Sequence, residues 1–301
     1  MRARRAYGSR EVWALLYRLL SGAFLLAVTS RFFADPPYPA WWNFGFFVAA
    51  LICQAFAVRG LRTPSGRAPV EVRPPVTGRW TALNSPANRV PSHGTAVYGQ
   101  MYAIDIVAEG EGEGEGEDGT GQGAGSVGAL SEGVVGRRRP AFALFWPFMR
   151  PPSSFPGFGV PLLAVADATV VHASDGQRDH LSRTSVPALL YLLAEGTLRD
   201  FLGPGRVVGN RIVLDLGDGV FALYAHVRRG SLRVAAGDRV RAGQQLGACG
   251  NSGNTTEPHV HFQLMDRPGL TAARGLPFTW TGIGIPANSE TFTVPAAYVG
   301  P

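Results

Sequence analysis

Two histidines separated by a single residue, His259 and His261, close a run rich in Gly and Asn. Side chains alternate between the two faces of a β-strand, so both imidazoles point the same way, while Val260 and Phe262 supply an apolar opposite face. Imidazole nitrogen is a common zinc ligand. The pair therefore indicates metal chemistry, in which one ring binds the ion and the other acts on substrate or water. The alternative is an exposed His pair on a polar strand face.

Further ligands must come from elsewhere, because a catalytic zinc ion usually has three protein ligands and one open position. The chain has six His. His226 ends an apolar, strand-like run, and His93 lies in a loop-like stretch ahead of another strand. Asp105 lies inside that apolar strand, where a carboxylate is costly to bury unless it is paired or bound to metal. His172 and His180 lack such a context, and we expect both at the surface.

The sequence around these residues resembles the lysostaphin/LytM-type zinc metallopeptidases, the M23 family. The resemblance covers roughly residues 75–285, with insertions. Its C-terminal third is the most specific part, since spaced glycines and three His agree in order. The segments that carry it are Ser92-His-Gly-Thr, Tyr102-Ala-Ile-Asp105, Pro161–Val171, Gly209–Gly219, Ala225-His226, Gly230-Ser231, Gly237–Gly247 and His259-Val-His261.

The resemblance implies a mainly β domain of the M23, or duplicated-hybrid-motif, type, with a central antiparallel sheet whose groove holds one Zn²⁺. Carried over to this chain, the zinc ligands are His93, Asp105 and His261. His226 and His259 match the catalytic histidines of the family, which do not bind the metal.

The first motif departs from the family pattern, which places the Asp much closer to the His. Here eleven residues, 94–104, separate His93 from Asp105. The two side chains can still converge if the segment Gly94–Gly99 loops back onto the strand. Glycines at both of its ends permit such a loop, because glycine readily adopts positive φ.

The resemblance also implies the activity: hydrolysis of a peptide bond in bacterial peptidoglycan by a zinc-activated water. The competing interpretation is a non-catalytic module of the same fold that binds wall peptides or regulates another cell-wall hydrolase. Degenerate relatives of that kind lose ligands, whereas this chain retains all five positions. A purely structural zinc site would need a fourth ligand, and none presents itself near these motifs.

Composition narrows the class of partner. All 28 basic residues are Arg and the net charge is +6, which favours an anionic wall or membrane surface. The absence of Lys excludes a biotinyl or lipoyl carrier, which the run Gly237–Gly247 otherwise resembles. No basic patch interleaves with aromatic residues, so we expect no nucleic-acid partner. Cys53 and Cys249 lie far apart in different settings and indicate neither a disulfide framework nor metal ligands.

The N-terminal residues 1–59 are expected to anchor the chain in the bacterial cell membrane through one or two transmembrane helices. Trp13–Thr29 and Ala40–Val58 are apolar, and the second is about long enough to cross a bilayer. Arg18 interrupts the first, and Trp41 and Trp42 suit an aromatic interface anchor at one end of the second. The alternative is a buried helical hairpin in the core of the domain.

Arginines on both sides of the two apolar segments conflict with the expected substrate. With two spans, the positive-inside rule places both termini in the cytoplasm, but a wall hydrolase needs its domain outside. One span, two spans in reversed orientation, or a cytoplasmic substrate would each resolve this conflict. We favour the outer face, because the family chemistry requires a wall substrate.

The remaining organisation follows from composition and turn signals. We expect a linker over 60–75, the peptidase domain over 76–285 with a disordered acidic, Gly-rich insertion at 109–139, and a C-terminal tail over 286–301. We interpret the insertion as a neutral length expansion; the sharper hypothesis is that the carboxylates of Glu109–Asp118 pair with Arg137–Arg139 or shield the positive site. Ser185–Leu202 is predicted to be a short helix packed on the domain, with a flap over the groove or against the membrane as the alternative. Strands are predicted at Arg79–Leu83, Met101–Ala108, Pro161–Ala173, Asn210–Leu216, Val220–Val227, Gln244–Cys249 and His259–Leu264.

Overall fold

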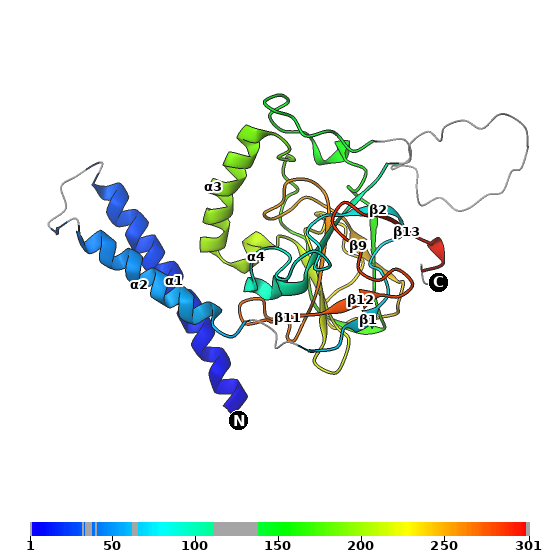
Figure 1. Cartoon of the computed structure of the whole chain (residues 1–301), viewed down its shortest axis with the longest axis horizontal. Coiled ribbons are helices and arrows are strands. Elements are labelled where there is room, and N and C mark those ends of the chain that lie inside the picture. Colours follow the sequence, from blue (N-terminus) through cyan, green and yellow to red (C-terminus); the bar gives the residue numbers. More distant parts are fainter. Residues whose placement is uncertain are drawn as a thin grey trace, which may run out of the picture.

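The computed structural model describes residues 2–31, 33, 38–39, 41–61, 66–110 and 138–298. Most of the acidic insertion expected at 109–139 therefore lies outside the described residues. Two parts are visible in Figure 1: an N-terminal pair of helices, and a strand-rich domain that contains the rest of the described chain.

The N-terminal helices are α1 (Arg2–Ser30) and α2 (Trp41–Val58), which confirms both predicted helices. They pack as an antiparallel hairpin, since Trp13 stacks on Phe56 and Phe24 lies against Phe47. The segments 11–30 and 41–58 are long and apolar enough to cross a membrane, judged by length and composition only. Most of their side chains face outward rather than into a protein core, as expected of helices that meet lipid.

The domain is built on an antiparallel sheet of nine strands in the order β13-β2-β3-β10-β7-β6-β5-β8, with β11 pairing to β10. This confirms the mainly β, antiparallel fold class. The strands are β2 (Gly78–Ala82), β3 (Ile104–Ala108), β5 (Ala168–Ser174), β6 (Arg211–Asp215), β7 (Phe221–Ala225), β8 (Arg239–Val240), β10 (Val260–Met265), β11 (Gly275–Leu276) and β13 (Thr291–Val294). The helical segments of the domain are η1 (Val97–Tyr102), η2 (Pro152–Ser154), α3 (Val186–Leu202), α4 (Pro204–Val207) and η3 (Ala296–Tyr298).

Two short sheets flank the large one. β1 (Val70–Val72) runs parallel to β12 (Phe278–Trp280), and β4 (Pro161–Leu163) runs antiparallel to β9 (Gln245–Ala248). The prediction of one continuous strand over 161–173 is wrong. The chain bends at residues 164–167, because Ala164 and Asp167 bond to the backbone of residues 242–244 instead of continuing the ladder.

Two segments expected to be irregular join the sheets. β1 falls within the expected linker, where Val70 and Val72 pair with β12. β13 falls within the expected tail, where it pairs with β2 and packs Phe292 against Trp280. An alternation of exposed and buried residues over 291–294 accounts for this, because it gives the segment one apolar face to bury.

The larger of two hydrophobic clusters lies on one face of the central strands. Val260, Phe262 and Leu264 of β10 point into a cluster that includes Tyr224 and Trp280, as the alternation of the sequence predicts. Replacing Phe262, which is fully buried, with Ala would cost about 3–5 kcal/mol. The intervening positions of β10 therefore face the other side of the sheet, and this side carries the histidines.

Candidate metal centre

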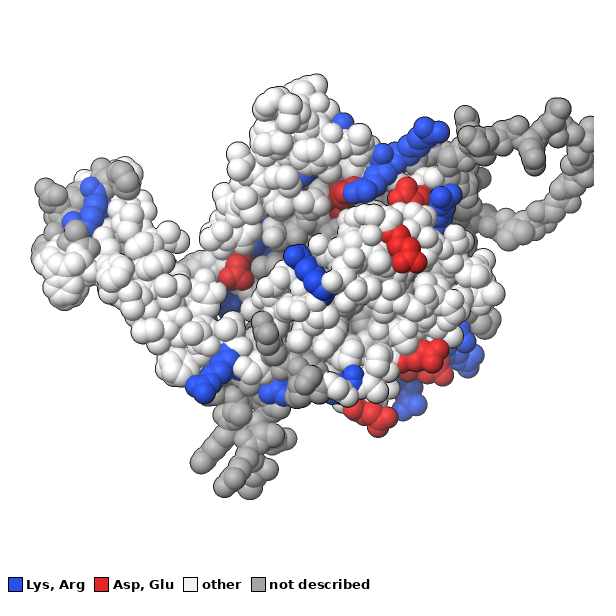
Figure 2. All heavy atoms as spheres, viewed as in Figure 1, with Lys and Arg blue, Asp and Glu red and all other residues white. Residues whose placement is uncertain are grey.

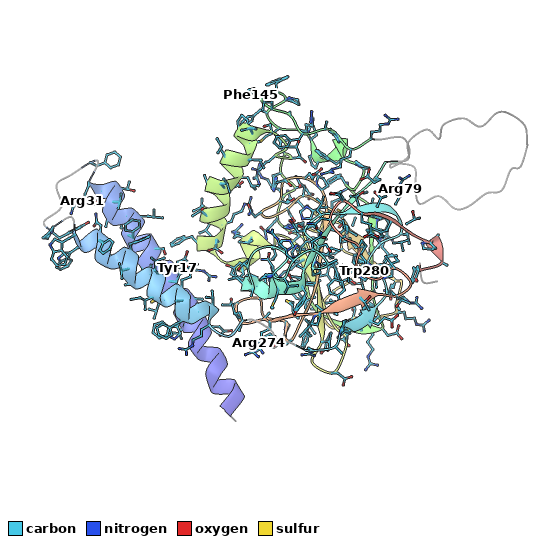
Figure 3. The ribbon with its side chains drawn as sticks, viewed as in Figure 1. Tyr17, Arg31, Arg79, Phe145, Arg274 and Trp280 are labelled. Atoms are coloured by element: carbon cyan, nitrogen blue, oxygen red, sulfur yellow. The ribbon has the colours of Figure 1, made fainter. Side chains whose placement is uncertain are left out.

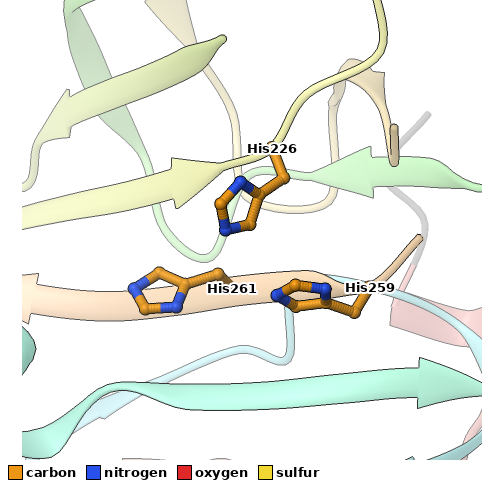
Figure 4. Close-up of side chains that lie close together, drawn as sticks. All are labelled: His226, His259 and His261. Atoms are coloured by element: carbon orange, nitrogen blue, oxygen red, sulfur yellow. The ribbon is translucent and has the colours of Figure 1, made fainter. Parts of the chain in front are cut away.

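Three neighbouring strands bring the predicted residues together. β10 lies between β3 and β7, and His261 is directly opposite Asp105 on β3 and Ala225 on β7. His226 follows Ala225 at the end of β7, and its ring projects toward His259, which directly precedes β10, and His261 on β10 (Figure 4). The antiparallel register therefore places one carboxylate and three imidazoles on one face, although 156 positions of sequence separate Asp105 from His261.

His93 reaches this group from the long loop before β3. Its Nε2 lies 2.9 Å from Oδ2 of Asp105, so the loop does turn back onto the strand. One ligand atom from each of His93, Asp105 and His261 lies within 4.8 Å of the others. Asn84 donates a hydrogen bond of 2.8 Å to the same carboxylate and so helps to orient it.

The shape of this loop depends on glycine and on one serine. Gly94 and Gly99 have φ of 72° and 78°, in the left-handed region. A Cβ at Gly99 would lie 2.9 Å from Nε2 of Gln263, so only glycine fits there. The hydroxyl of Ser92 donates to the carbonyl of Ala103 at 2.6 Å and lies 3.0 Å from Nδ1 of His93, from which it accepts. This leaves Nε2 of His93 with a lone pair toward Asp105.

The partners of His261 fix its tautomer. Its Nε2 lies 3.0 Å from Oε1 of Gln263, whose own amide nitrogen donates to the carbonyl of Tyr98 at 2.8 Å. Oε1 is therefore an acceptor, and Nε2 of His261 carries a proton. Nδ1 faces Oδ1 of Asp105 at 2.8 Å, a distance at which a second proton or a bound cation joins the ring to the carboxylate.

His259 and His226 are oriented in a different way. Nδ1 of His226 donates to the carbonyl of Ser252 at 2.7 Å, and Nδ1 of His259 donates to the carbonyl of Glu257 at 2.8 Å. Both rings thus keep Nε2 free, and their centroids are 4.8 Å apart. His226 has a φ of 59°, a strained backbone conformation of the kind that occurs at functional sites.

The electrostatics of the cluster are dominated by burial and by the shared carboxylate. Burial alone would raise the pKa of Asp105, but its electrostatic interactions with the neighbouring His93 and His259 and its hydrogen bonds with His261 and His93 hold it well below its usual value. Burial would lower the pKa of His261, and Asp105 raises it instead. Burial, followed by charge on the two neighbouring histidines, lowers the pKa of His226 well below its usual value. The site therefore holds a negative carboxylate that attracts a cation.

The donor set fits zinc. His93, Asp105 and His261 offer two imidazole nitrogens and one carboxylate oxygen, a ligand number and type found in catalytic zinc sites that keep an open position. Asn84 and Gln263 support two of these ligands in the manner of residues that orient metal sites. Neither cysteine contributes, because Cys53 and Cys249 are buried away from this cluster as free thiols.

The two remaining histidines lie outside the site. His172 is half-buried and bonds to Ser174. The expectation that His180 lies at the surface is wrong: it is buried, and its ring nitrogens contact the carbonyls of Leu181 and Gly253. Local sequence gave no sign of this, because its neighbours Asp179 and Ser182 are polar.

Sequence reasoning missed several supporting residues. Gln263 follows His261 by two positions, and strand periodicity alone could have placed it on the same face. Arg139 forms a two-pronged ion pair with Glu257, in which Nε donates to Oε2 at 2.9 Å. No local signal joins these two residues, which are 118 positions apart. The backbone carbonyl of Glu257 accepts a hydrogen bond from His259, so Glu257 connects this ion pair directly to a residue of the site.

The fold is a β-sheet domain whose sheet groups one carboxylate with four imidazoles, and comparison with known proteins shows what this chain is similar to. Residues 189–271 match the model of Peptidase family M23. The resemblance to LytM-type M23 peptidases is thereby confirmed.

Short stretches of curated relatives match this chain. The glycyl-glycine endopeptidase ALE-1 of Staphylococcus capitis is 47% identical over 58 residues, which is 19% of this chain and 16% of that protein. The peptidoglycan DD-endopeptidase ShyA of Vibrio cholerae is 36% identical over 59 residues, or 20% of this chain and 13% of that protein. The chain thus spans less than a fifth of the length of these relatives. Among solved structures, the catalytic domain of lysostaphin from Staphylococcus simulans aligns with 39% of this chain and 68% of its own, at 26% identity and a TM-score of 0.27.

Proposed function

We propose that this protein is a zinc metalloendopeptidase that hydrolyses peptide bonds in bacterial peptidoglycan and is anchored to the cell membrane by its N-terminal helices. The observation that carries the proposal is the convergence of five residues on one face of the sheet. Asp105 lies between His93 and His261, and His226 and His259 lie beside them. This arrangement supports an enzyme over a non-catalytic wall-binding module, since every position needed for catalysis is present.

In this proposal His93, Asp105 and His261 hold the metal through Nε2, a carboxylate oxygen and Nδ1, respectively. Zinc, when bound, supplies Lewis acidity that polarises a peptide carbonyl and brings the pKa of water down to about 7. Asn84 and Gln263 keep the ligands in their orientation through the hydrogen bonds described above. Among the described residues, His226 and His259 form a second group of potential ligands with His261. The proposal assigns these two rings to catalysis, which leaves the metal an open position for substrate.

His226 and His259 handle protons. Each ring donates Nδ1–H to a backbone carbonyl, so each presents Nε2 to the site. An Nε2 lone pair can accept a proton from the attacking water, and the resulting imidazolium can donate it to the leaving amine or stabilise the oxyanion. The carboxylate of Asp105 lies 3.6 Å from Nε2 of His259 and would stabilise a proton held there.

The substrate class and the location rest on separate observations. One relative is named as a peptidoglycan DD-endopeptidase, and another is named as a glycyl-glycine endopeptidase. A net charge of +6 suits an anionic wall. The two apolar helices α1 and α2 support an anchor, and we place the domain on the outer face, where peptidoglycan lies.

The test combines metal content with turnover. The full chain, purified in detergent and reconstituted with zinc, should hold about one zinc ion per chain and release new amino termini from purified peptidoglycan. His93→Ala should lose both zinc and activity. A chain that holds zinc but cleaves no wall peptide would point to a structural metal. A wild-type chain without zinc would point to a binding or regulatory module.

A further inference from the structure

The outer face of α3 is apolar. All of its residues are described, and among them only Ala188 is buried. The large side chains exposed on α3 recur at helical spacing on one side and are Val186, Leu190, Leu193, Leu198 and Leu202, with Tyr191 beside them. Leu190 and Leu193 are 64% and 67% exposed. A helix on a soluble domain normally turns such a stripe toward the core.

The charged residues of α3 face the domain instead. Glu195 forms ion pairs with Arg183 and Arg199, and the side chain of Arg183 is almost completely buried. Asp200 accepts a hydrogen bond from the hydroxyl of Tyr98, which also bonds to Arg18. The polar side of the helix is thus satisfied internally, and the apolar side is presented outward. This orientation is the reverse of that expected in water.

A neighbouring segment, residues 142–148, extends the same surface. It exposes Phe142, Leu144, Phe145, Trp146 and Phe148, and Trp146 is 84% exposed. Ala143 and Phe148 bond to Thr184 and Ser185 at the start of α3, so the segment is fixed to the helix. Phe145 projects outward at the top of Figure 3, and the surface over this region is mostly free of charge in Figure 2.

We call the exposed apolar residues of 142–148 and 181–202 the apolar face. In the described part of the strand-rich domain, the only exposed large apolar side chains that do not belong to the apolar face are Val90 and Val171. Contiguous apolar surface of this kind marks a site of contact with a membrane or a protein. Because these side chains are concentrated in two hydrogen-bonded segments, they differ from the single apolar residues that are scattered over ordinary protein surfaces.

The apolar face continues into the N-terminal hairpin. Phe201 packs against α1 so closely that a Cβ on Gly22 would lie 2.8 Å from its ring. Arg18, on the same helix, reaches the hydroxyl of Tyr98, which is bonded to Asp200. Gly22 and Arg18 both belong to the 11–30 segment that is apolar enough to cross a membrane. The end of α3 therefore lies level with a candidate span, and whatever surrounds that span also meets α3.

We propose that the apolar face is a second membrane-contacting surface, which meets the lipid bilayer that surrounds α1. The inference rests on the proposed anchor. Exposed aromatic residues such as Trp146 and Tyr191 suit the boundary between headgroups and acyl chains. Lipid is favoured over a protein partner because the face is continuous with α1 and none of the charges of α3 is left free to specify a partner.

This contact would fix the site close to the membrane. The inner side of α3 packs on the segment Ser252–Glu257, since Gly196 lies against Asn254 and the amide of Arg183 bonds to Thr256. The carbonyls of Ser252 and Glu257 are the acceptors that orient His226 and His259. The element that touches lipid is thus the one that covers the loop supporting the catalytic histidines. The substrate would be peptide strands that lie next to the bilayer.

The test uses the full chain in liposomes of phosphatidylcholine and phosphatidylglycerol. Single cysteines at Leu193→Cys, Phe145→Cys, Leu26→Cys and Arg239→Cys are labelled with bimane, and quenching by doxyl-labelled phosphatidylcholine is measured. Both native cysteines are buried, so labelled wild type gives the background. We expect labels at 193 and 145 to be quenched several-fold more than the label at 239, an exposed position on β8. Leu26, exposed on α1, reports on the anchor independently.

Each outcome decides between the occupants. Quenching at 26 with none at 193 and 145 overturns the inference and leaves the anchor intact. Quenching at 193 and 145 without quenching at 26 supports the lipid-binding face and removes the spanning anchor. Shielding of the label at 193 that depends on protein concentration, without lipid quenching, would assign the face to a second copy of the chain and overturn the inference. The variant Leu190→Gln/Leu193→Gln should abolish quenching at 145 and preserve it at 26.

Discussion

Gln263 holds His261 by a hydrogen bond of 3.0 Å between its side-chain carbonyl and Nε2 of the ring. The bond has a direction, because the amide nitrogen of Gln263 is already committed to the carbonyl of Tyr98. A residue two positions along the strand thus directs Nδ1 of His261, rather than Nε2, toward the proposed metal site. Tyr98 belongs to the loop that carries His93, so the same glutamine links both of the proposed histidine ligands.

Replacing Gln263 should weaken metal binding without removing a ligand. Gln263→Met removes the acceptor for Nε2–H and should lower zinc affinity by about 10–100-fold. Gln263→Glu retains an acceptor oxygen for Nε2–H but cannot donate to the carbonyl of Tyr98, so its zinc affinity should lie between those of wild type and Gln263→Met. Competition with a fluorescent zinc chelator measures both. Equal affinity for wild type and Gln263→Met would show that the tautomer of His261 is set by other contacts.

One experiment should distinguish the proposed zinc ligands from the proposed catalytic histidines. Asp105→Ala and His261→Ala should abolish zinc binding and therefore turnover. His259→Ala should retain zinc and lose turnover by at least about 10²-fold, the usual contribution of a positioned acid or base. Metal analysis and peptidoglycan hydrolysis on the same preparations give the comparison. Loss of zinc in His259→Ala together with its retention in His261→Ala would reverse the assigned roles.

Arg139 should act on turnover through Glu257. Arg139→Met frees the Glu257 carboxylate and loosens the backbone whose carbonyl orients His259. Turnover should fall on the order of tenfold, since small displacements of a catalytic group are costly, while zinc content stays unchanged. Arg150→Met is the matched control, because among the described residues its guanidinium bonds only to the carbonyl of Ala141, within the 141–150 segment. A parallel loss in both variants would indicate a general effect on that segment.

Shortening the acidic insertion should leave catalysis nearly intact. Arg139, one of the arginines offered as its partners, is engaged with Glu257. Replacing residues 111–136 with a short Gly-Ser linker should therefore change the rate of peptidoglycan hydrolysis by no more than about twofold, since loop length alone costs little. A large increase in rate would support the hypothesis that the carboxylates shield the site.

His180 should contribute to the pH dependence of stability. Burial, and then the positive charge of Arg183, lower its pKa below the usual value of 6.5. The unfolded chain then binds the proton more readily than the folded one, so this contribution to stability is complete above pH 6.5 and is lost as the pH falls below it. Denaturant midpoints of wild type and His180→Asn at pH 7.5 and 5.5 test this. The variant should lose less stability between the two pH values, and identical losses would contradict the assignment.

The sequence could predict those features of the fold that depend on local periodicity. The alternation of His259, Val260, His261 and Phe262 gave the strand, its two faces and the direction of the imidazoles. The apolar lengths gave both N-terminal helices. In contrast, the pairing of Arg139 with Glu257 depends on a fold that joins distant segments, and no spacing rule encodes it.

The orientation of α3 shows the same limit. Hydrophobic spacing predicted a helix at 185–202 and was correct, yet it gave no information on which side faces the domain. That choice is made by the buried partners Arg183 and Tyr98, which draw Glu195 and Asp200 inward. Likewise, the burial of His180 follows from the carbonyl of Gly253, which is 73 positions away.

The direct pairing of Asp105 with His261 has a kinetic consequence. The two ligands meet only after β3 and β10 have joined across most of the domain, and such non-local contacts form late and slowly. In the proposed site, early folding species therefore offer zinc few ligands, and its binding free energy stabilises mainly the completed sheet. Bound metal should slow unfolding far more than it speeds refolding. In a cell, the bound ion would prolong the lifetime of the folded domain by slowing its unfolding.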